Sequence, residues 1–167
     1  MNTTTILIIA VVFGGSFLIM IPFAIFYSKK KKKVEKYKTN NTDKALLHIY
    51  GGSVIVDGKQ VSDVEHIKGN DLECLVPLSE GKHTIEAQYE ITDIHMGKNM
   101  NLKTPKAISS EIEFVAGYEY TIGVYFYSPE DRKAYYKGNV GEDVYSQELE
   151  ISGGGYSKAY LICYKES

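Results

Sequence analysis

The sequence has only two cysteines, Cys74 and Cys163, and this scarcity excludes two classes of small domain. Two cysteines are too few for a disulfide scaffold, and they lie too far apart in the chain for a zinc knuckle. Each lies in an apolar, strand-like pattern, which predicts a buried free thiol. A disulfide between them is expected only if the domain lies outside the cell.

The common catalytic motifs are also missing from the sequence. It has no Gly-x-Ser-x-Gly, and neither cysteine has a neighbour in sequence that would activate it. Gly153–Gly155 lacks the Lys-Ser/Thr of a phosphate-binding loop and lies between two strand patterns, so it predicts a hairpin turn. The acidic pairs Glu130–Asp131 and Glu142–Asp143 lack the spacing of an EF-hand and indicate solvated turns. We predict no catalytic residue and no cofactor, which leaves a small hydrolase as the least favoured function.

Histidines are few, and their positions do not predict a metal site. His48 and His83 lie in strand patterns and are expected to be strand residues with satisfied rings. Asp93 and His95, with two methionines nearby, carry groups that a soft metal would use. A site needs three or four converging ligands, however, and a polar loop accounts for the same residues. We therefore predict no metal ligand.

Positive charge is scarce outside one short segment. Residues 29–38 hold seven lysines and one glutamate, whereas the remaining 12 basic and 20 acidic residues give the rest of the chain a net charge of −8. Nucleic acid is therefore not expected as a partner, because a basic surface is its usual footprint. A lysine cluster beside a membrane is attracted to anionic lipid headgroups. The predicted membrane-proximal basic residues are Lys29, Lys30, Lys31, Lys32, Lys33, Lys36 and Lys38.

One long apolar run, Ile6–Tyr27, precedes these lysines. As a helix its 22 residues would span about 33 Å, close to the ~30 Å hydrocarbon core of a bilayer. A signal peptide is the alternative, but the tail at residues 1–5 has no lysine or arginine, and Phe23–Ile25 is a poor cleavage site. The sequence therefore predicts a transmembrane anchor at residues 6–28.

The lysines also predict the orientation of this anchor. Lysine and arginine flanking a membrane helix remain in the cytoplasm, which puts the N terminus outside and the C-terminal domain in the cytoplasm. The chain is thus expected to be a single-pass protein of the cell membrane. Ala10 and Gly14 form a small-x-x-x-small pair, so a homodimer through the anchor is a further hypothesis.

Beyond a polybasic juxtamembrane linker at residues 29–44, strand patterns recur through a single domain at residues 45–167. Strands are predicted at Ala45–Tyr50, Ser53–Val56, Leu72–Leu78, His83–Ile91, Glu111–Val115, Tyr118–Ser128, Ala134–Lys137, Val144–Ile151 and Tyr156–Tyr164. Asp57-Gly58 is the signal of a tight hairpin turn. No stretch after the anchor shows a sustained helical period. We predict an all-β fold, an antiparallel β-sandwich behind a single N-terminal transmembrane helix.

Two hairpins are expected within this sandwich. Leu72–Leu78 should pair with His83–Ile91, and Glu111–Val115 with Tyr118–Ser128 through the turn at Ala116-Gly117. The clearest alternation is His83–Ile91, which predicts a half-buried strand.

Three segments share motifs with a known family: Val54–Lys59 (VIVDGK), Pro77–Ile85 (PLSEGKHTI) and Ala116–Ile122 (AGYEYTI). The first two resemble the PEGA-type pattern of small bacterial β-sandwich domains, and the third is similar to the later A-G-x-x-Y strand entry of related envelope proteins of unknown activity. The resemblance covers roughly residues 50 to 125. The motif residues are turn and strand-entry residues, which carry fold rather than chemistry. The resemblance implies a non-catalytic accessory module at a surface or membrane.

The longest connection, Thr92–Ala107, is the predicted partner-binding loop, because long loops in compact domains are often functional. It combines apolar and basic side chains, and the candidate contact residues are Ile94, Met96, Lys98, Met100, Leu102, Lys103 and Lys106. The favoured function is a membrane-anchored accessory module that binds an unidentified protein partner or scaffolds a membrane complex. The alternative is an extracytoplasmic envelope module that binds glycan.

Overall fold

A computed structural model describes residues 27–50, 53–69, 73–88, 90–95, 98–104, 107–150 and 158–166 of the chain. The chain divides into two units, Met1–Tyr37 and Lys38–Ser167. Residues 27–40 are helical, so the lysine cluster of the predicted linker lies on a helix. The predicted anchor, apart from its last two residues, and the Ala10/Gly14 pair lie outside the described residues. Within the described part, no helix is both long and apolar enough to cross a membrane.

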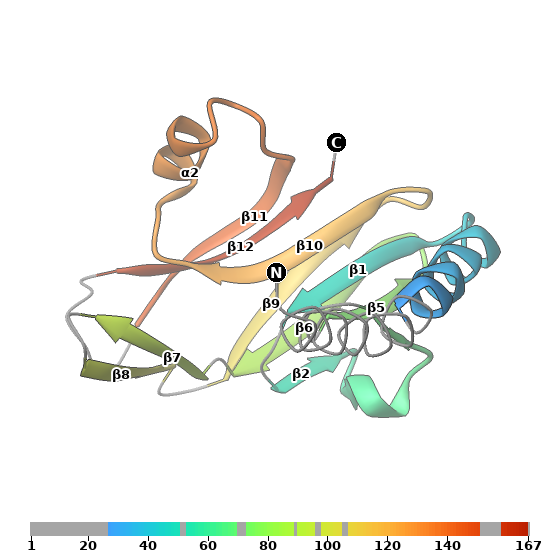
Figure 1. The fold of residues 1–167 in the computed structure, drawn as a ribbon, viewed down its shortest axis with the longest axis horizontal. Coiled ribbons are helices and arrows are strands. Elements are labelled where there is room, and N and C mark those ends of the chain that lie inside the picture. The colour runs from blue at the N-terminus through green and yellow to red at the C-terminus, as the bar shows by residue number, and fades with distance from the viewer. Residues whose placement is uncertain are drawn as a thin grey trace, which may run out of the picture. The chain divides into compact units, whose positions relative to one another are not determined.

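The second unit is built mainly of strands, which confirms the predicted all-β class. One sheet contains β1 (Ala45–Tyr50), β4 (Ile67–Lys68), β5 (Glu73–Leu78), β10 (Glu119–Tyr125), β11 (Glu142–Leu149) and β12 (Ala159–Lys165), in the order β11-β12-β10-β1-β5-β4 (Figure 1). A second sheet contains β2 (Ser53–Val56), β3 (Lys59–Gln60), β6 (Gly81–Gln88) and β9 (Ile108–Phe114), in the order β3-β2-β6-β9.

The central strand of the larger sheet is the first strand of the chain. β1 pairs in parallel with β10 (Leu47 opposite Tyr120) and antiparallel with β5 (Leu47 opposite Val76). The parallel pair departs from the purely antiparallel fold that the sequence predicted. It also places β10, which comes late in the chain, beside the first strand.

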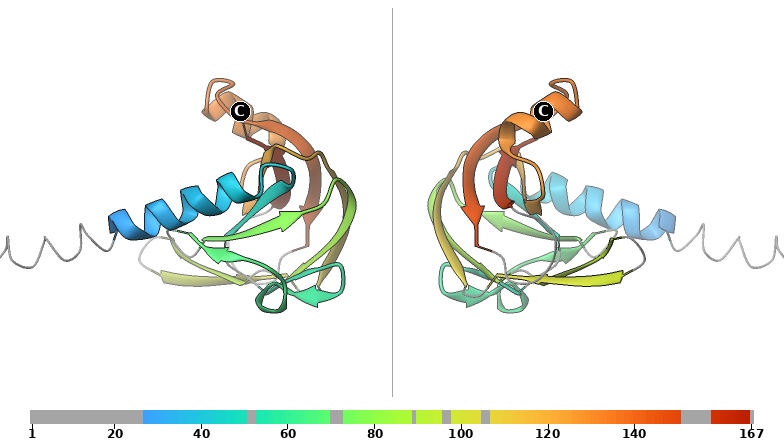
Figure 2. Two further views of the ribbon diagram at one scale, coloured as in Figure 1. Left: turned by 90° about the vertical axis from the view of Figure 1, so that its right-hand side faces the viewer. Right: turned by 90° about the vertical axis from the view of Figure 1, so that its left-hand side faces the viewer.

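The two sheets lie face to face (Figure 2). Their inner faces enclose one hydrophobic core. At its centre the rings of Phe114 and Tyr120 meet edge to face, with centroids 4.9 Å apart. The predicted alternation of β6 is confirmed at Ile85 and Ala87, each 1% exposed. Other buried core residues are Ala45, Leu47, Ile49, Val54, Val56, Val76, Leu78, Ile112, Ile122, Leu149, Ala159, Leu161 and Cys163.

The outer face of the larger sheet is partly buried as well. Leu46, Leu75 and Ile162 point away from the core cluster and are almost inaccessible, as are the polar residues His48 and Thr121. Burial on both faces explains why β1 reads ALLHIY, a nearly continuous apolar run rather than an alternating one. This outer face holds the candidate site.

Both long hairpins predicted from the sequence are wrong in their pairing. β5 and β6 belong to different sheets, and so do β9 and β10. The short connection Ser79-Glu80 therefore leads from one sheet to the other and does not join neighbouring strands of one sheet. The same holds for the turn at Ala116-Gly117. Alternation identifies the inward face of a strand, but two strands that face each other across a core show the same pattern as two that pair within one sheet.

Helix α2 (Pro129–Tyr135) was missed, and the strand predicted at Ala134–Lys137 is wrong. The Ser128 hydroxyl caps the helix by accepting a hydrogen bond from the Asp131 N–H at 3.1 Å. Proline in the first turn and the acidic pair Glu130–Asp131 complete a standard helix start. The helix is too short to show a helical period. The capping residue and the first-turn residues were therefore its only signal in the sequence.

The predicted long loop is instead mostly a two-stranded ribbon. β7 (Glu90–His95) and β8 (Lys98–Lys103) pair antiparallel, with Ile91 opposite Leu102 and Asp93 opposite Met100. They form a sheet of their own. Met96 and Lys106 lie outside the described residues.

The two cysteines are free thiols, and the sheet keeps them apart. Cys163 lies opposite Ile122, Ile122 opposite Ile49, and Ile49 opposite Cys74. Three strand spacings separate the two, or about 14 Å between Cα atoms, well beyond disulfide reach. Cys163 is buried as predicted, and burial raises its pKa to about 12, whereas Cys74 is only half-buried. A disulfide between them cannot form in this fold on either side of a membrane. Whether they are paired therefore does not show on which side the domain lies.

Candidate functional site: a histidine between carboxylates beside a tyrosine pocket

A row of side chains crosses the outer face of the larger sheet. Leu75, His48, Thr121, Tyr164 and Asp143 lie opposite one another on β5, β1, β10, β12 and β11. Directly opposed residues on neighbouring strands project from the same face. Four polar side chains on one sheet face therefore stand in a line, although they are far apart in sequence.

His48 is at the centre of this row and is 4% exposed. Its Nδ1 contacts Glu73 Oε1, and its Nε2 lies 2.9 Å from Glu119 Oε2. Both ring nitrogens thus face carboxylate oxygens. Each of these two nitrogen–oxygen contacts therefore needs a proton or a cation between its two atoms. The prediction of a strand histidine with a satisfied ring is confirmed for His48.

Glu119 also contacts a lysine. Lys38 Nζ lies 2.7 Å from the same Oε2 that faces the histidine. Burial raises the pKa of Glu119, but the Lys38 hydrogen bond and charge, together with His48, outweigh it and leave the pKa below its ordinary 4.5. Glu119 is therefore held as a carboxylate.

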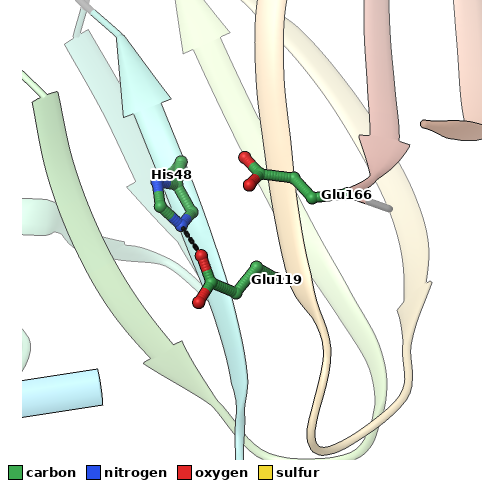
Figure 3. Close-up of side chains that lie close together, drawn as sticks. All are labelled: His48, Glu119 and Glu166. Atoms are coloured by element: carbon green, nitrogen blue, oxygen red, sulfur yellow. Dashed lines mark hydrogen bonds and ion pairs between the residues drawn. The ribbon is translucent and has the colours of Figure 1, made fainter. Parts of the chain in front are cut away.

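Glu166 follows β12 and brings a third carboxylate to the group. Its backbone N–H donates to the Glu119 carbonyl at 2.8 Å, and its Oε1 accepts from the Thr121 hydroxyl at 2.6 Å. One donor atom each from His48, Glu119 and Glu166 lies within 4.8 Å of the others. Figure 3 shows the Glu119 and Glu166 carboxylates turned toward the His48 ring.

Glu73 links the cluster to the edge of the site. Its Oε1 accepts from the Tyr50 hydroxyl at 3.1 Å as well as facing His48. Burial first, and then the negative charge of Glu73, raise the pKa of Tyr50 to about 12. Tyr50 thus remains a phenol donor that helps to hold Glu73 against the ring.

Arg132 of α2 is buried at the other end of the row. Its Nη1 lies 2.7 Å from Asp143 Oδ1, and its guanidinium carbon lies 4.0 Å from the Tyr164 ring centroid and 5.2 Å from that of Tyr125. Burial, followed by hydrogen bonding to Tyr164, raises the pKa of Tyr125 above its ordinary value. The pairing and the rings fix α2 against the sheet.

A pocket of about 410 Å³ lies between α2 and the strands. Two of its lining residues carry a charge, Arg132 and Glu166. Arg132 is paired with Asp143, so Glu166 provides the carboxylate that a ligand in the pocket would meet. The lining is Tyr125, Arg132, Tyr136, Asn139, Val140, Gly141, Tyr164 and Glu166. Glu166 belongs to both the pocket and the histidine cluster.

The residues singled out from the sequence lie elsewhere. Six of the seven predicted basic residues lie in the first unit, and the seventh, Lys38, reaches Glu119. Ile94, Lys98, Met100, Leu102 and Lys103 lie on the β7–β8 ribbon.

His83, the other strand histidine, is satisfied as predicted. Its Nδ1 lies 2.6 Å from Asp57 Oδ2, and its Nε2 lies 2.9 Å from the Ser79 carbonyl oxygen. It lies on β6 of the smaller sheet and therefore contributes nothing to the site.

Sequence reasoning missed the site because its members come from three separate strands and from the residue that follows a fourth. Glu73, Glu119 and Glu166 each resemble an ordinary solvated carboxylate in the sequence, and only the register brings them together. One local sign existed: His48 interrupts an otherwise apolar strand that is buried on both faces. No family model, curated protein or solved structure matches this chain.

Proposed function

We propose that the chain is a membrane-tethered, non-enzymatic accessory module whose β-domain, a β-sandwich, binds a protein partner. The apolar run Ile6–Tyr27 followed by Lys29–Lys33 supports the tether, with the lysines on anionic headgroups and the domain in the cytoplasm. The resemblance to PEGA-type domains implies the same kind of accessory role.

The pocket beside Glu166 is the observation that carries the binding function. Arg132 already lies over the Tyr164 and Tyr125 rings, so the Tyr136 ring and the Glu166 carboxylate are the groups that suit a basic side chain, since a cation is attracted both to a ring face and to a carboxylate. A volume of about 410 Å³ accommodates a side chain and some of its flanking backbone. The net charge of −8 beyond residue 38 favours encounter with a basic partner.

The binding test uses the full chain in nanodiscs of zwitterionic lipid, which removes lipid attraction to the lysines. Fluorescent peptides that differ only in a central lysine, arginine, glutamate or leucine are titrated by anisotropy. We expect the lysine or arginine peptide to bind best and Tyr136→Ala to weaken that binding at least tenfold.

Tyr118→Ala is the matched control, because Tyr118 is 46% exposed, Tyr136 is 49% exposed, and Tyr118 lies outside the pocket. Equal binding of all four peptides, or equal effects of the two substitutions, would overturn the pocket as the binding site. Aromatic rings beside Asn139 also suit a sugar, so a panel of oligosaccharides tests the glycan alternative.

Sidedness is tested in intact cells. A reporter fused after Ser167 should be active only in the cytoplasm, and protease added outside should leave the domain uncut. Cleavage of the domain in intact cells would contradict the cytoplasmic placement and favour the extracytoplasmic alternative.

A further inference from the structure

The His48 cluster has the donor atoms of a metal site as well as those of a charge network. His48, Glu119 and Glu166 come from β1, β10 and the residue after β12, and one donor atom from each lies within 4.8 Å of the others. One imidazole nitrogen and two carboxylates form a mixed N/O set, which suits first-row divalent metals more than Mg²⁺ or Ca²⁺. We propose that these three side chains form a binding site for a divalent transition metal, with Zn²⁺ as its probe.

The distances need little change to accept the ion. Ligands about 2.0–2.2 Å from Zn²⁺ lie about 3.0–3.4 Å from each other, depending on coordination geometry. His48 Nε2 and Glu119 Oε2 are already 2.9 Å apart. Only the Glu166 side chain has to move inward, and it is an exposed residue near the end of the described chain, where rotation is cheap.

The surrounding groups already orient the ligands. Glu73 occupies His48 Nδ1 and so leaves Nε2 directed at Glu119 and Glu166. Thr121 donates to Glu166 Oε1 at 2.6 Å. A carboxylate on the far nitrogen of a ligating histidine is the usual supporting partner at metal sites, and it fixes the tautomer that leaves the other nitrogen free to bind.

Lys38 is the built-in competitor for this site. Its ammonium lies 2.7 Å from the Glu119 oxygen that would bind the ion. A divalent ion beside an ammonium is repelled, so metal binding must displace Lys38 from Glu119. Removing the lysine should therefore tighten metal binding. If the cluster were only a charge network, the same change would remove one ion pair and would not increase the affinity for a metal.

Three protein ligands leave at least one coordination position open for water. Glu166 also lines the tyrosine pocket, so the ion would lie at the edge of that pocket. The ion would join β1, β10 and the C-terminal end of β12 through side chains. Both proposals use Glu166, so a bound ion would compete with a basic side chain there. The metal titration contains no peptide, and Tyr136 is not one of the three ligands, so the two proposals are tested separately.

The test is a Zn²⁺ titration of the metal-stripped full chain in nanodiscs, by calorimetry and by competition with a chromophoric chelator. We expect one ion per chain, with Mg²⁺ failing to compete. His48→Gln and Glu166→Gln should each weaken binding at least tenfold, and Glu73→Gln about tenfold or more, as for other supporting partners of a ligand. Glu166→Gln also guards against misfolding, because its side chain is exposed.

The chain offers a matched control for each substitution. His83→Gln removes a histidine that also contacts a carboxylate, Asp57, at 2.6 Å but lies on the other sheet. Lys82→Gln breaks a lysine–glutamate contact, with Glu111, of the same 2.7 Å as that of Lys38. We expect neither control to alter Zn²⁺ affinity and Lys38→Gln to tighten it several-fold.

Three results would overturn the proposal. They are equal losses from the His48 and His83 variants, Mg²⁺ binding as tightly as Zn²⁺, and a Lys38→Gln variant that binds no more tightly than the wild type. The first and third results would identify the cluster as a charge network that holds the strands and C-terminal residues together. The second would show that the site does not select a transition metal.

Discussion

Arg132 and Asp143 form an ion pair at 2.7 Å in which the arginine side chain is 4% exposed and the aspartate side chain 14% exposed. Arg132 is the single arginine of the chain, and its guanidinium also lies over the Tyr164 ring at 4.0 Å. The pair ties α2 to β11 through side chains that water hardly reaches. The pocket therefore has a fixed wall.

Loss of Arg132 should unfold this corner of the domain. Arg132→Ala leaves the Asp143 carboxylate buried without its partner, so we expect a loss of about 3–5 kcal/mol in the free energy of unfolding. Lys82→Ala breaks a pair of equal length, but both of its side chains are more than 60% exposed, so stability should hardly change. Urea denaturation of the two variants measures the difference, and similar midpoints would mean that the Arg132 pair is solvated.

The core prediction concerns β6, where the inward and outward residues alternate. Ile85 is 1% exposed, so Ile85→Ala should cost about 2–5 kcal/mol through lost burial and a residual cavity. Glu86→Ala, on the other face of the strand, should cost about 0.5 kcal/mol or less. Chemical denaturation followed by circular dichroism compares them, and equal costs would contradict the assigned inward face.

Acid sensitivity should depend in part on Asp57. Burial raises its pKa, but hydrogen bonds from His83 and from the Thr84 N–H together outweigh this and leave the pKa below its ordinary 3.8. A carboxyl with a depressed folded-state pKa contributes stability above pH 3.8, and this contribution is lost as the pH falls through the folded-state pKa. We therefore expect Asp57→Asn to reduce the fall in stability between pH 6 and pH 3.

Asparagine is a suitable replacement because Asp57 has a φ of 49°, a left-handed conformation that asparagine tolerates. The free energy of unfolding is measured for both proteins at the two pH values. An unchanged difference between pH 6 and pH 3 would show that Asp57 titrates normally in the folded protein.

The β7–β8 ribbon remains the predicted partner surface outside the pocket. Replacing the three predicted contact lysines of the Thr92–Ala107 segment by glutamine should remove proteins that copurify with the full chain after crosslinking in cells, and leave the thermal unfolding midpoint nearly unchanged. The three positions are Lys98, Lys103 and Lys106. The control replaces three exposed lysines elsewhere, Lys59, Lys82 and Lys158. If both triple variants lose the same proteins, general charge rather than the ribbon explains the association.

Local features were predictable because each strand or turn carries its own signal. β1 and β2 have the predicted bounds, and the Asp57-Gly58 turn has positive φ at both residues, as a tight hairpin requires. These features depend on neighbouring residues alone. Pairing was not predictable in the same way, since the partner of β1 is β10, and nothing in either strand specifies a parallel neighbour.

The candidate site was the least predictable part for the same reason. His48 and Thr121 lie opposite each other only because β1 and β10 pair in this register. A shift of one residue in this register would place His48 opposite a β10 residue whose side chain faces the core. It would also separate His48 from Glu119. Side-chain chemistry at the site thus depends on long-range pairing, whereas turns and caps depend on a few consecutive residues.

The parallel pairing of β1 with β10 also constrains how the protein is made. Leu46 leaves the ribosome roughly 70 residues before Glu119, the residue it pairs with. At about 5–20 residues per second, the first strand waits several seconds for its neighbour. During that time an apolar segment with unpaired backbone groups is exposed to other nascent chains and to chaperones. If the proposed anchor enters the membrane first, the strand waits for its partner at the bilayer surface.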